Sequence, residues 1–183
     1  MSSGTRSKTK LSSRFLVYYA LTYLALIGLM GFIIDRSTRS ELISGLDDNL
    51  AIAARLAREN LPADPADYQA WAETTFEASG FRTTLIGEDG VVLADSHSDP
   101  EDMENHLTRP EVQIALSGEI GVANRISAST GFDQRYVALP PRRGLIVRTS
   151  VPARVIDDEL GNIRLVILST TGTLGLIGVV VVA

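Results

Sequence analysis

The amino-acid sequence predicts an α+β domain, built on an antiparallel five-stranded sheet, between two membrane-spanning helices. Two runs, 15–34 and 165–183, predict the membrane helices because they contain no charged residue over 20 and 19 positions. At about 1.5 Å per residue, each run is long enough to cross a hydrocarbon core about 30 Å thick. The domain is predicted by short β-type runs that alternate with turn residues between positions 81 and 150.

Charge predicts how the chain is oriented. Residues 1–14 carry four basic residues and no acidic one, so we expect a cytoplasmic N-terminal tail. The run 15–34 exceeds the apolar core of about 7–15 residues found in signal peptides, and no cleavage site follows it, so we expect it to be retained as an anchor. Residues 35–164 then form an extracytoplasmic domain of a protein in the cell (inner, cytoplasmic) membrane. Residues 165–183 begin a second span, which we expect to be cut short by the end of the sequence.

The segment 35–164 is acidic. It contains all 22 acidic residues and 13 of the 17 basic residues, for a net charge of about −9. This charge argues against a nucleic-acid partner and leaves cations and cationic peptides open. The sequence has no cysteine, which excludes both a disulfide framework and a thiolate metal site.

Two helices are predicted before the sheet. Apolar residues recur at three- and four-residue steps from Leu42 to Ala57, which indicates a helix. The pattern covers barely two heptads, so it leaves open whether the helix packs on its own domain or pairs with a second copy in a homodimer. A second helix is predicted over 64–79, because Asp64-Pro65 resembles a helix start and Gly80 a helix end.

Five short runs predict the strands: 81–86, 91–94, 121–127, 135–139 and 145–150. The first two flank Gly87-Glu88-Asp89-Gly90, whose Asp-Gly pair is typical of a hairpin turn. A helix over 110–117 is predicted between the hairpin and the other strands, because it begins with Thr-x-x-Glu capping residues and a proline. A last helix, 151–163, is expected to lead into the second span.

The densest polar stretch, 95–106, contains both histidines and five carboxylates. Imidazole and carboxylate groups are suitable ligands for a divalent ion. The candidate metal ligands are His97, Asp99, Glu101, Asp102, Glu104 and His106. Their spacing matches no known metal motif, and residues of these types also cap turns and helix starts, which is the role that we favour.

A second candidate is a set of arginines that could clamp an anion through bidentate hydrogen bonds. The set comprises Arg109, Arg125, Arg135, Arg142, Arg143 and Arg148. We favour the alternative that they balance the acidic residues as surface pairs, because sheet edges usually carry such charge. The sequence contains no nucleophile elbow, phosphate-binding loop or zinc-helix motif, so no catalytic residue and no cofactor site is predicted for this region.

The segment from Asp89 onward resembles the external domains of PhoR-type (phosphate-regulon-like) two-component sensor histidine kinases. The resemblance begins with the hairpin Asp89-Gly90-Val91-Val92-Leu93-Ala94-Asp95-Ser96. It continues in order and spacing through 99–100, 103–106, 109–112, 115–118, 121, 125–127 and 136–138. The resemblance covers roughly residues 10–183 and is strongest from Asp89 to Pro140.

This resemblance implies a PAS-like external domain between two spans, in a homodimeric receptor. It also implies that a HAMP linker, a dimerising domain with the phospho-accepting histidine and an ATP-binding domain follow the second span. Autophosphorylation with ATP and phosphotransfer to a response regulator therefore belong to a longer protein. The resemblance identifies no stimulus, so a small ligand and an envelope protein both stay open as partners.

Two other functions remain open. The same input region could serve a chemoreceptor or a cyclase, and the sequence beyond residue 183 would distinguish these outputs. It could also be a membrane-anchored interaction module with no catalytic output. A secreted hydrolase is a more remote alternative.

Overall fold

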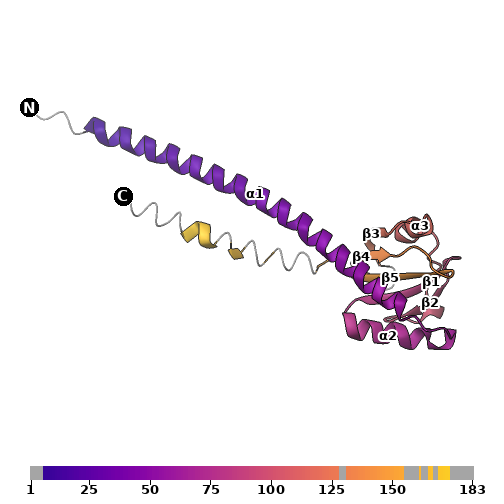
Figure 1. Cartoon of the computed structure of the whole chain (residues 1–183). Helices are drawn as coiled ribbons and strands as arrows, with labels where there is room; N and C mark the ends of the chain where they lie inside the picture. Colours follow the sequence, from indigo (N-terminus) through magenta and orange to yellow (C-terminus); the bar gives the residue numbers. More distant parts are fainter. Residues whose placement is uncertain (1–5, 128–130, 155–160, 162–164, 167–168, 174–183) are drawn as a thin grey trace, which may run out of the picture. The chain divides into compact units, whose positions relative to one another are not determined.

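The computed structural model describes residues 6–127, 131–154, 161, 165–166 and 169–173. The chain divides into two compact units, one formed by Met1–Ser40 with Glu159–Ala183 and the other by Glu41–Asp158. Figure 1 labels the helices and strands of the described residues. The second unit contains the whole sheet and the helices that pack on it, so it positions the candidate site.

The first helix, α1 (Arg6–Glu59), is continuous over 54 residues. Within it, Leu21–Glu59 is the one helix of the described residues that is long and apolar enough to cross a membrane. Leu24, Met30 and Phe32 are exposed, which suits a lipid-facing surface better than an aqueous one. The predicted span 15–34 lies inside α1, and the helix predicted after Leu42 continues it without a break. The second predicted span and the helix predicted over 151–163 lie mostly outside the described residues. At the start of that helix the prediction is wrong, because Val151 and Pro152 belong to a strand.

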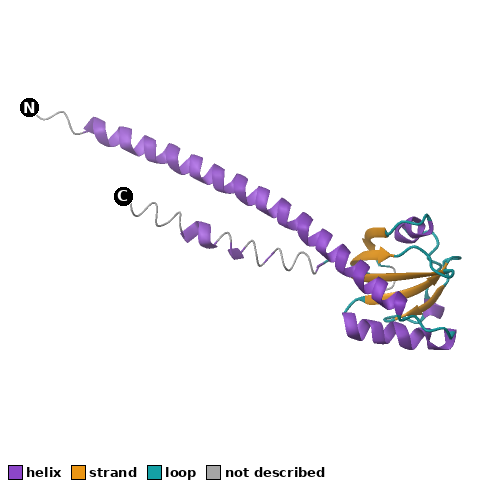
Figure 2. Ribbon diagram, in the orientation of Figure 1, coloured by secondary structure: helices purple, strands orange, loops and turns teal. Residues whose placement is uncertain are grey.

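The sheet has five antiparallel strands in the order β2-β1-β5-β4-β3 (Figure 2). The strands are β1 (Arg82–Gly87), β2 (Val92–Asp95), β3 (Gly121–Ile126), β4 (Asp133–Ala138) and β5 (Leu145–Pro152). All five predicted strands are present, and the predicted antiparallel sheet of a mixed helix and strand fold is confirmed. Because β1 pairs with β5, the first and last strands are neighbours in the middle of the sheet.

Four short helical segments accompany the sheet: η1 (Pro65–Asp67), α2 (Tyr68–Ser79), η2 (Pro100–Asp102) and α3 (Pro110–Leu116). Asp64 begins the η1–α2 pair, because its carboxylate accepts a hydrogen bond from the Ala66 amide at 3.0 Å. Gly80 ends α2 with a φ of 73°, a left-handed conformation that glycine adopts without strain. The helices predicted over 64–79 and 110–117 are therefore confirmed.

The end of α1 and helix α2 pack on one face of the sheet. Leu50, Ala54 and Ala57 of α1 are buried there, and the Trp71 indole donates a hydrogen bond to the Ala57 carbonyl at 3.1 Å. Leu46 also packs against this core. The apolar pattern predicted for this helix therefore packs on its own domain, which was one of the two alternatives.

Helix α3 packs on the opposite face, where Val112 and Ala115 meet Ile86 and Ile146. Helix α3 also lies very close to the start of β3, since a Cβ on Gly121 would overlap the backbone of Glu111. Neighbouring residues of a strand point to opposite faces. On β5, Arg148 therefore faces the α3 side, whereas the Thr149 hydroxyl donates a hydrogen bond to the Leu50 carbonyl of α1 at 2.9 Å.

Candidate functional site

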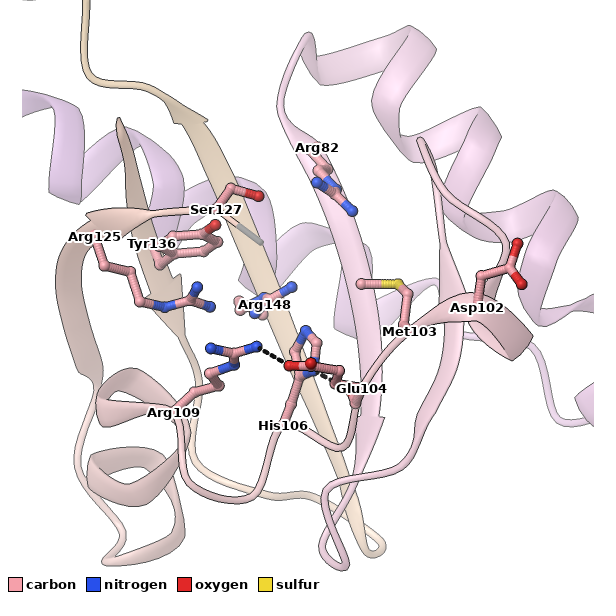
Figure 3. Close-up of a pocket in the computed structure, with 10 residues that line it drawn as sticks. All are labelled: Arg82, Asp102, Met103, Glu104, His106, Arg109, Arg125, Ser127, Tyr136 and Arg148. Atoms are coloured by element: carbon pink, nitrogen blue, oxygen red, sulfur yellow. Dashed lines mark hydrogen bonds and ion pairs between the residues drawn. The ribbon is translucent and has the colours of Figure 1, made fainter. Parts of the chain in front are cut away.

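A cavity of about 200 Å³ lies on the α3 side of the sheet (Figure 3). It lies between the sheet and the segment 102–109 and is partly open to solvent. Its lining residues are Arg82, Asp102, Met103, Glu104, His106, Arg109, Arg125, Ser127, Tyr136 and Arg148. Four arginines in one small cavity make it the candidate functional site.

The floor of the cavity comes from four strands. Arg82 on β1, Arg125 on β3, Tyr136 on β4 and Arg148 on β5 all point to the α3 face. Strand order explains why they meet, because β1 and β5 lie next to each other and β4 and β3 follow. Residues that are up to 66 positions apart in sequence are thereby brought to one surface.

One buried carboxylate forms ion pairs with two of these arginines. Glu111, at the start of α3, is fully buried and accepts from Arg125 Nη2 at 2.9 Å and from Arg148 Nη1 at 3.1 Å. Burial alone would raise the pKa of Glu111, but the hydrogen bond from Arg125 and the charge of Arg148 outweigh it and lower that pKa. Arginine remains protonated in proteins, so this group of three carries a net charge of +1.

The Tyr136 ring contacts the guanidinium groups of the same two arginines. The guanidinium of Arg125 lies 4.2 Å from the ring centroid, and that of Arg148 lies 4.9 Å from it. Both distances are within the range of a cation–π contact. The Nε atoms of Arg148 and Arg109 are buried and have no hydrogen-bond partner among the described residues. Two N–H donors of the lining arginines are therefore buried without a hydrogen bond among the described residues.

Arg82 is neutralised by Asp95, the last residue of β2. Its Nε lies 3.0 and 3.1 Å from the two carboxylate oxygens, and its Nη2 lies 2.9 Å from Oδ1. Thr84 connects this pair to Arg148, because its hydroxyl donates to Asp95 at 2.7 Å and accepts from Arg148 at 3.1 Å. A continuous polar network thus runs from Glu111 through Arg148 to Asp95 and Arg82.

His106 is buried in the cavity wall and is neutral. Its Nδ1 lies 2.7 Å from the carbonyl oxygen of Glu104. A carbonyl can only accept, so Nδ1 carries the hydrogen and Nε2 is left as an acceptor. Burial and the charge of Arg148 lower the pKa of His106 from 6.5 to about 4. Figure 3 shows the ring pointing toward Arg148.

The hairpin turn between β1 and β2 holds the segment that carries His106. The His106 amide donates to the Gly90 carbonyl at 2.7 Å, and the Asn105 side chain donates to the Asp89 carbonyl at 2.9 Å. Gly90 has a φ of 82°, and a Cβ there would overlap Asn105 and Leu107. The glycine of the predicted Asp-Gly turn therefore also makes room for the cavity wall.

The structure separates the six candidate metal ligands. Asp102, Glu104 and His106 line the cavity, whereas His97 packs edge-on against Phe76 of α2, with ring centroids 4.4 Å apart. The two histidines therefore do not form one site.

The other two candidates, Asp99 and Glu101, lie at the start of η2. Asp99 caps this short helix, because its carboxylate accepts from the Glu101 amide at 3.0 Å. Among the described residues, no group of three or more histidine, aspartate or glutamate side chains is placed to hold a metal ion. Metal binding by this segment stays a hypothesis, whereas the capping role of Asp99 is seen directly.

The structure also divides the six candidate arginines. Arg109, Arg125 and Arg148 converge in the cavity, as an anion clamp requires. Arg135 instead pairs with Asp47 of α1, with two N–O distances of 2.7 Å, and Arg142 pairs with Glu59 at the surface. The remaining member, Arg143, occupies a turn with a φ of 55°.

Sequence reasoning missed Arg82 as a member of the site. One signal was available, since Arg82 and Asp95 are opposite charges within two strands that a tight turn predicts to be paired. Charged residues inside paired strands are found buried only when they compensate each other.

Comparison with solved structures identifies the fold. The sensor domain of the Vibrio cholerae histidine kinase DctB matches with a TM-score of 0.52 and 18% identity, over 76% of this chain and 60% of that one. The sensor domain of Escherichia coli DcuS matches with a TM-score of 0.51 and 14% identity, over 68% and 98%. The ligand-binding domain of the Campylobacter jejuni chemoreceptor Tlp3, solved with L-valine, matches with a TM-score of 0.55 and 13% identity, over 87% and 68%.

Sequence comparison gives no corresponding result. No protein-family model matches the sequence, and no curated protein sequence matches it significantly. The structural likeness alone shows that this chain has the fold of the sensor domains of histidine kinases and of a chemoreceptor.

Proposed function

We propose that this chain is the input region of a membrane-bound, PhoR-type two-component sensor histidine kinase, and that its PAS-like external domain binds a small anion. The observation that carries the proposal is the arginine-lined cavity of a domain that has a sensor-domain fold. The polar lining and the size of the cavity support a small polar ligand rather than a large apolar one.

The buried charges favour an anion, since the other two carboxylates of the cavity, those of Asp102 and Glu104, are exposed. Two fully buried carboxylates, Asp95 and Glu111, face three arginines, Arg82, Arg125 and Arg148. Among the described residues, the acidic partner of a fourth arginine, Arg109, is the exposed Glu104. The planar guanidinium group binds carboxylate and phosphate oxygens in pairs, which makes either group a suitable ligand.

Signalling would follow from binding. The ligand would have to interact differently with two arrangements of the domain in order to shift their populations. ATP-dependent autophosphorylation and transfer to a response regulator would occur in domains that follow the second span. The chemoreceptor alternative is supported by the likeness to Tlp3, and the coding sequence after Ala183 would decide between these outputs.

The anion proposal is tested by thermal unfolding of the full chain in detergent, followed by the fluorescence of the single tryptophan, Trp71. We expect at least one of inorganic phosphate, succinate and citrate to raise the melting temperature by several degrees at saturating concentration, because ligands that bind only the folded state stabilise it. Arg125→Gln should remove this rise, since Arg125 lines the cavity. Arg135→Gln, which removes the same charge outside the cavity, should retain it. No rise with any of the three anions would contradict the proposal.

We also propose that the chain forms a homodimer through the exposed side of α1. Ile52 and Leu56 are 49% and 62% exposed, and they line an apolar groove between α1 and α2 together with Trp71 and Phe81. Apolar surface of this kind is typical of interaction sites.

Replacing both Ile52 and Leu56 by aspartate should therefore reduce cross-linking of the chain in membranes to about the background level, since charges at a buried apolar contact are strongly unfavourable. Ser44→Asp places a charge on an exposed part of α1 outside the groove and should leave cross-linking unchanged. Leu46 is unsuitable for this test because it packs in the domain core. Equal cross-linking of the double variant and the unmodified chain would exclude this surface.

A further inference from the structure

Arg109 differs from the other arginines of the cavity in its partner. Arg82, Arg125 and Arg148 pair with carboxylates that are completely buried. Arg109 instead pairs with Glu104, whose side chain is 80% exposed, at a distance of 3.2 Å from Nη2 to Oε2. Its Nε is buried and has no hydrogen-bond partner among the described residues.

The Glu104 side chain can leave this pair at little cost. An exposed carboxylate stays hydrated when it is released, and exposed ion pairs contribute little to stability. Release of a buried carboxylate such as Glu111 would leave charges unpaired in the interior and is strongly unfavourable. Among the four arginines, Arg109 is therefore the one whose partner exchanges most readily.

Only the side chain of Glu104 would have to move. Its carbonyl oxygen accepts from His106 Nδ1, and the neighbouring Asn105 is held to the hairpin turn by its bond to Asp89. The backbone of the cavity wall is thus fixed by hydrogen bonds that do not involve the Glu104 carboxylate. Figure 3 shows this carboxylate beside Arg109, on the side of the cavity opposite Arg125 and Tyr136.

We propose that Glu104 is a built-in competitor of the anionic ligand, which must displace its carboxylate from Arg109 in order to bind. This inference rests on the anion-binding function proposed above and adds a residue that weakens binding. Competition between Glu104 and the ligand for Arg109 would lower the affinity of the cavity for anions. It would favour ligands with an acid group that can take the place of the Glu104 carboxylate. Removal of Glu104 should consequently improve binding rather than impair it.

The test is a calorimetric titration of the full chain in detergent at low ionic strength, with inorganic phosphate, succinate and citrate as probes. Glu104→Gln should lower the Kd of the anion that binds by about two- to fivefold, the effect expected from loss of one exposed ion pair. Asp102→Asn is the matched control, because it removes the same charge from a residue that also lines the cavity but has no ion pair among the described residues. It should change the Kd by less than about twofold, since only screened long-range charge is altered.

A double-mutant cycle shows whether Glu104 acts through Arg109. Arg109→Gln alone should weaken anion binding, and in that background Glu104→Gln should give no further gain beyond that of Asp102→Asn. Coupling between two residues in contact is what such a cycle measures. Melting temperatures of all variants in the absence of anion should stay close to that of the unmodified chain, because the altered side chains are at least partly exposed.

The possible results separate the two proposals. An anion that binds the unmodified chain with the same Kd as the Glu104→Gln variant would overturn the competitor role and leave the anion-binding function in place. Equal gains from Glu104→Gln and Asp102→Asn would also overturn it, because general charge would then explain both. Absence of binding to either protein by all three probes would overturn the anion-binding function and the competitor role together.

Discussion

Replacing Glu111 by alanine is expected to lower the free energy of unfolding by about 3–5 kcal/mol, the usual effect of removing one partner from a buried ion pair. Glu111 is fully buried and is the acceptor for both Arg125 and Arg148. Without it, the fully buried Arg148 would lose its carboxylate partner among the described residues and would keep its contacts with Thr84 and the face of Tyr136. The loss is measured by chemical unfolding of the full chain in detergent, followed by Trp71 fluorescence.

Glu104→Ala is the control for this prediction. It removes another glutamate that pairs with an arginine of the cavity, but Glu104 is exposed, so the change should be below about 1 kcal/mol. Similar stabilities of the Glu111 and Glu104 variants would show that the buried network does not stabilise the domain.

Acidification from pH 7.5 to pH 5 is expected to destabilise the domain by about 2 kcal/mol through His106 alone. The folded state lowers the pKa of His106 from 6.5 to about 4. Between these two values the unfolded state binds a proton that the folded state excludes, so stability falls as the pH falls through this window. The loss is complete near pH 4, below which both states are protonated.

The pH effect is assigned by comparing two variants. His106→Asn removes the group that titrates, so the stability lost between pH 7.5 and pH 5 should be smaller by about 2 kcal/mol in this variant. His97→Asn should change the slope less, because His97 is more exposed and its pKa is lowered less. An unchanged slope in the His106 variant would contradict the buried, neutral state of this histidine.

The helices and strands of the domain were predictable because their signals are local. The Asp-Gly turn at Asp89-Gly90 and the cap at Asp64 depend on residues that are a few positions apart, and so do helix ends such as Gly80. The apolar pattern of α1 was also visible, but whether it packs on its own sheet depends on partners such as Val137, almost 90 positions away. Local sequence contains no information on that choice.

The cavity was not predictable from the same signals. Arg148 was interpreted as a surface residue because sheet edges carry charge, but β5 lies in the centre of the sheet between β1 and β4. The strand order, which places the last strand beside the first, brings Arg148 together with Arg82 and Arg125. That order is a property of the whole fold, so the six arginines could be recognised as candidates but not sorted into cavity and surface.

Two adjacent residues of β5 make contacts on opposite faces of the sheet, one in the cavity and one with the first helix. Arg148 is clamped on the cavity side by Glu111, Thr84 and Tyr136, while Thr149 is bonded to the Leu50 carbonyl of α1 on the other side. The rigid peptide unit between them transmits displacement. If the proposed anion moved Arg148 together with its strand, the bond between Thr149 and Leu50 would be the first contact with α1 to be affected. One peptide unit of β5 thus separates the contacts of the cavity from the contact with the first helix.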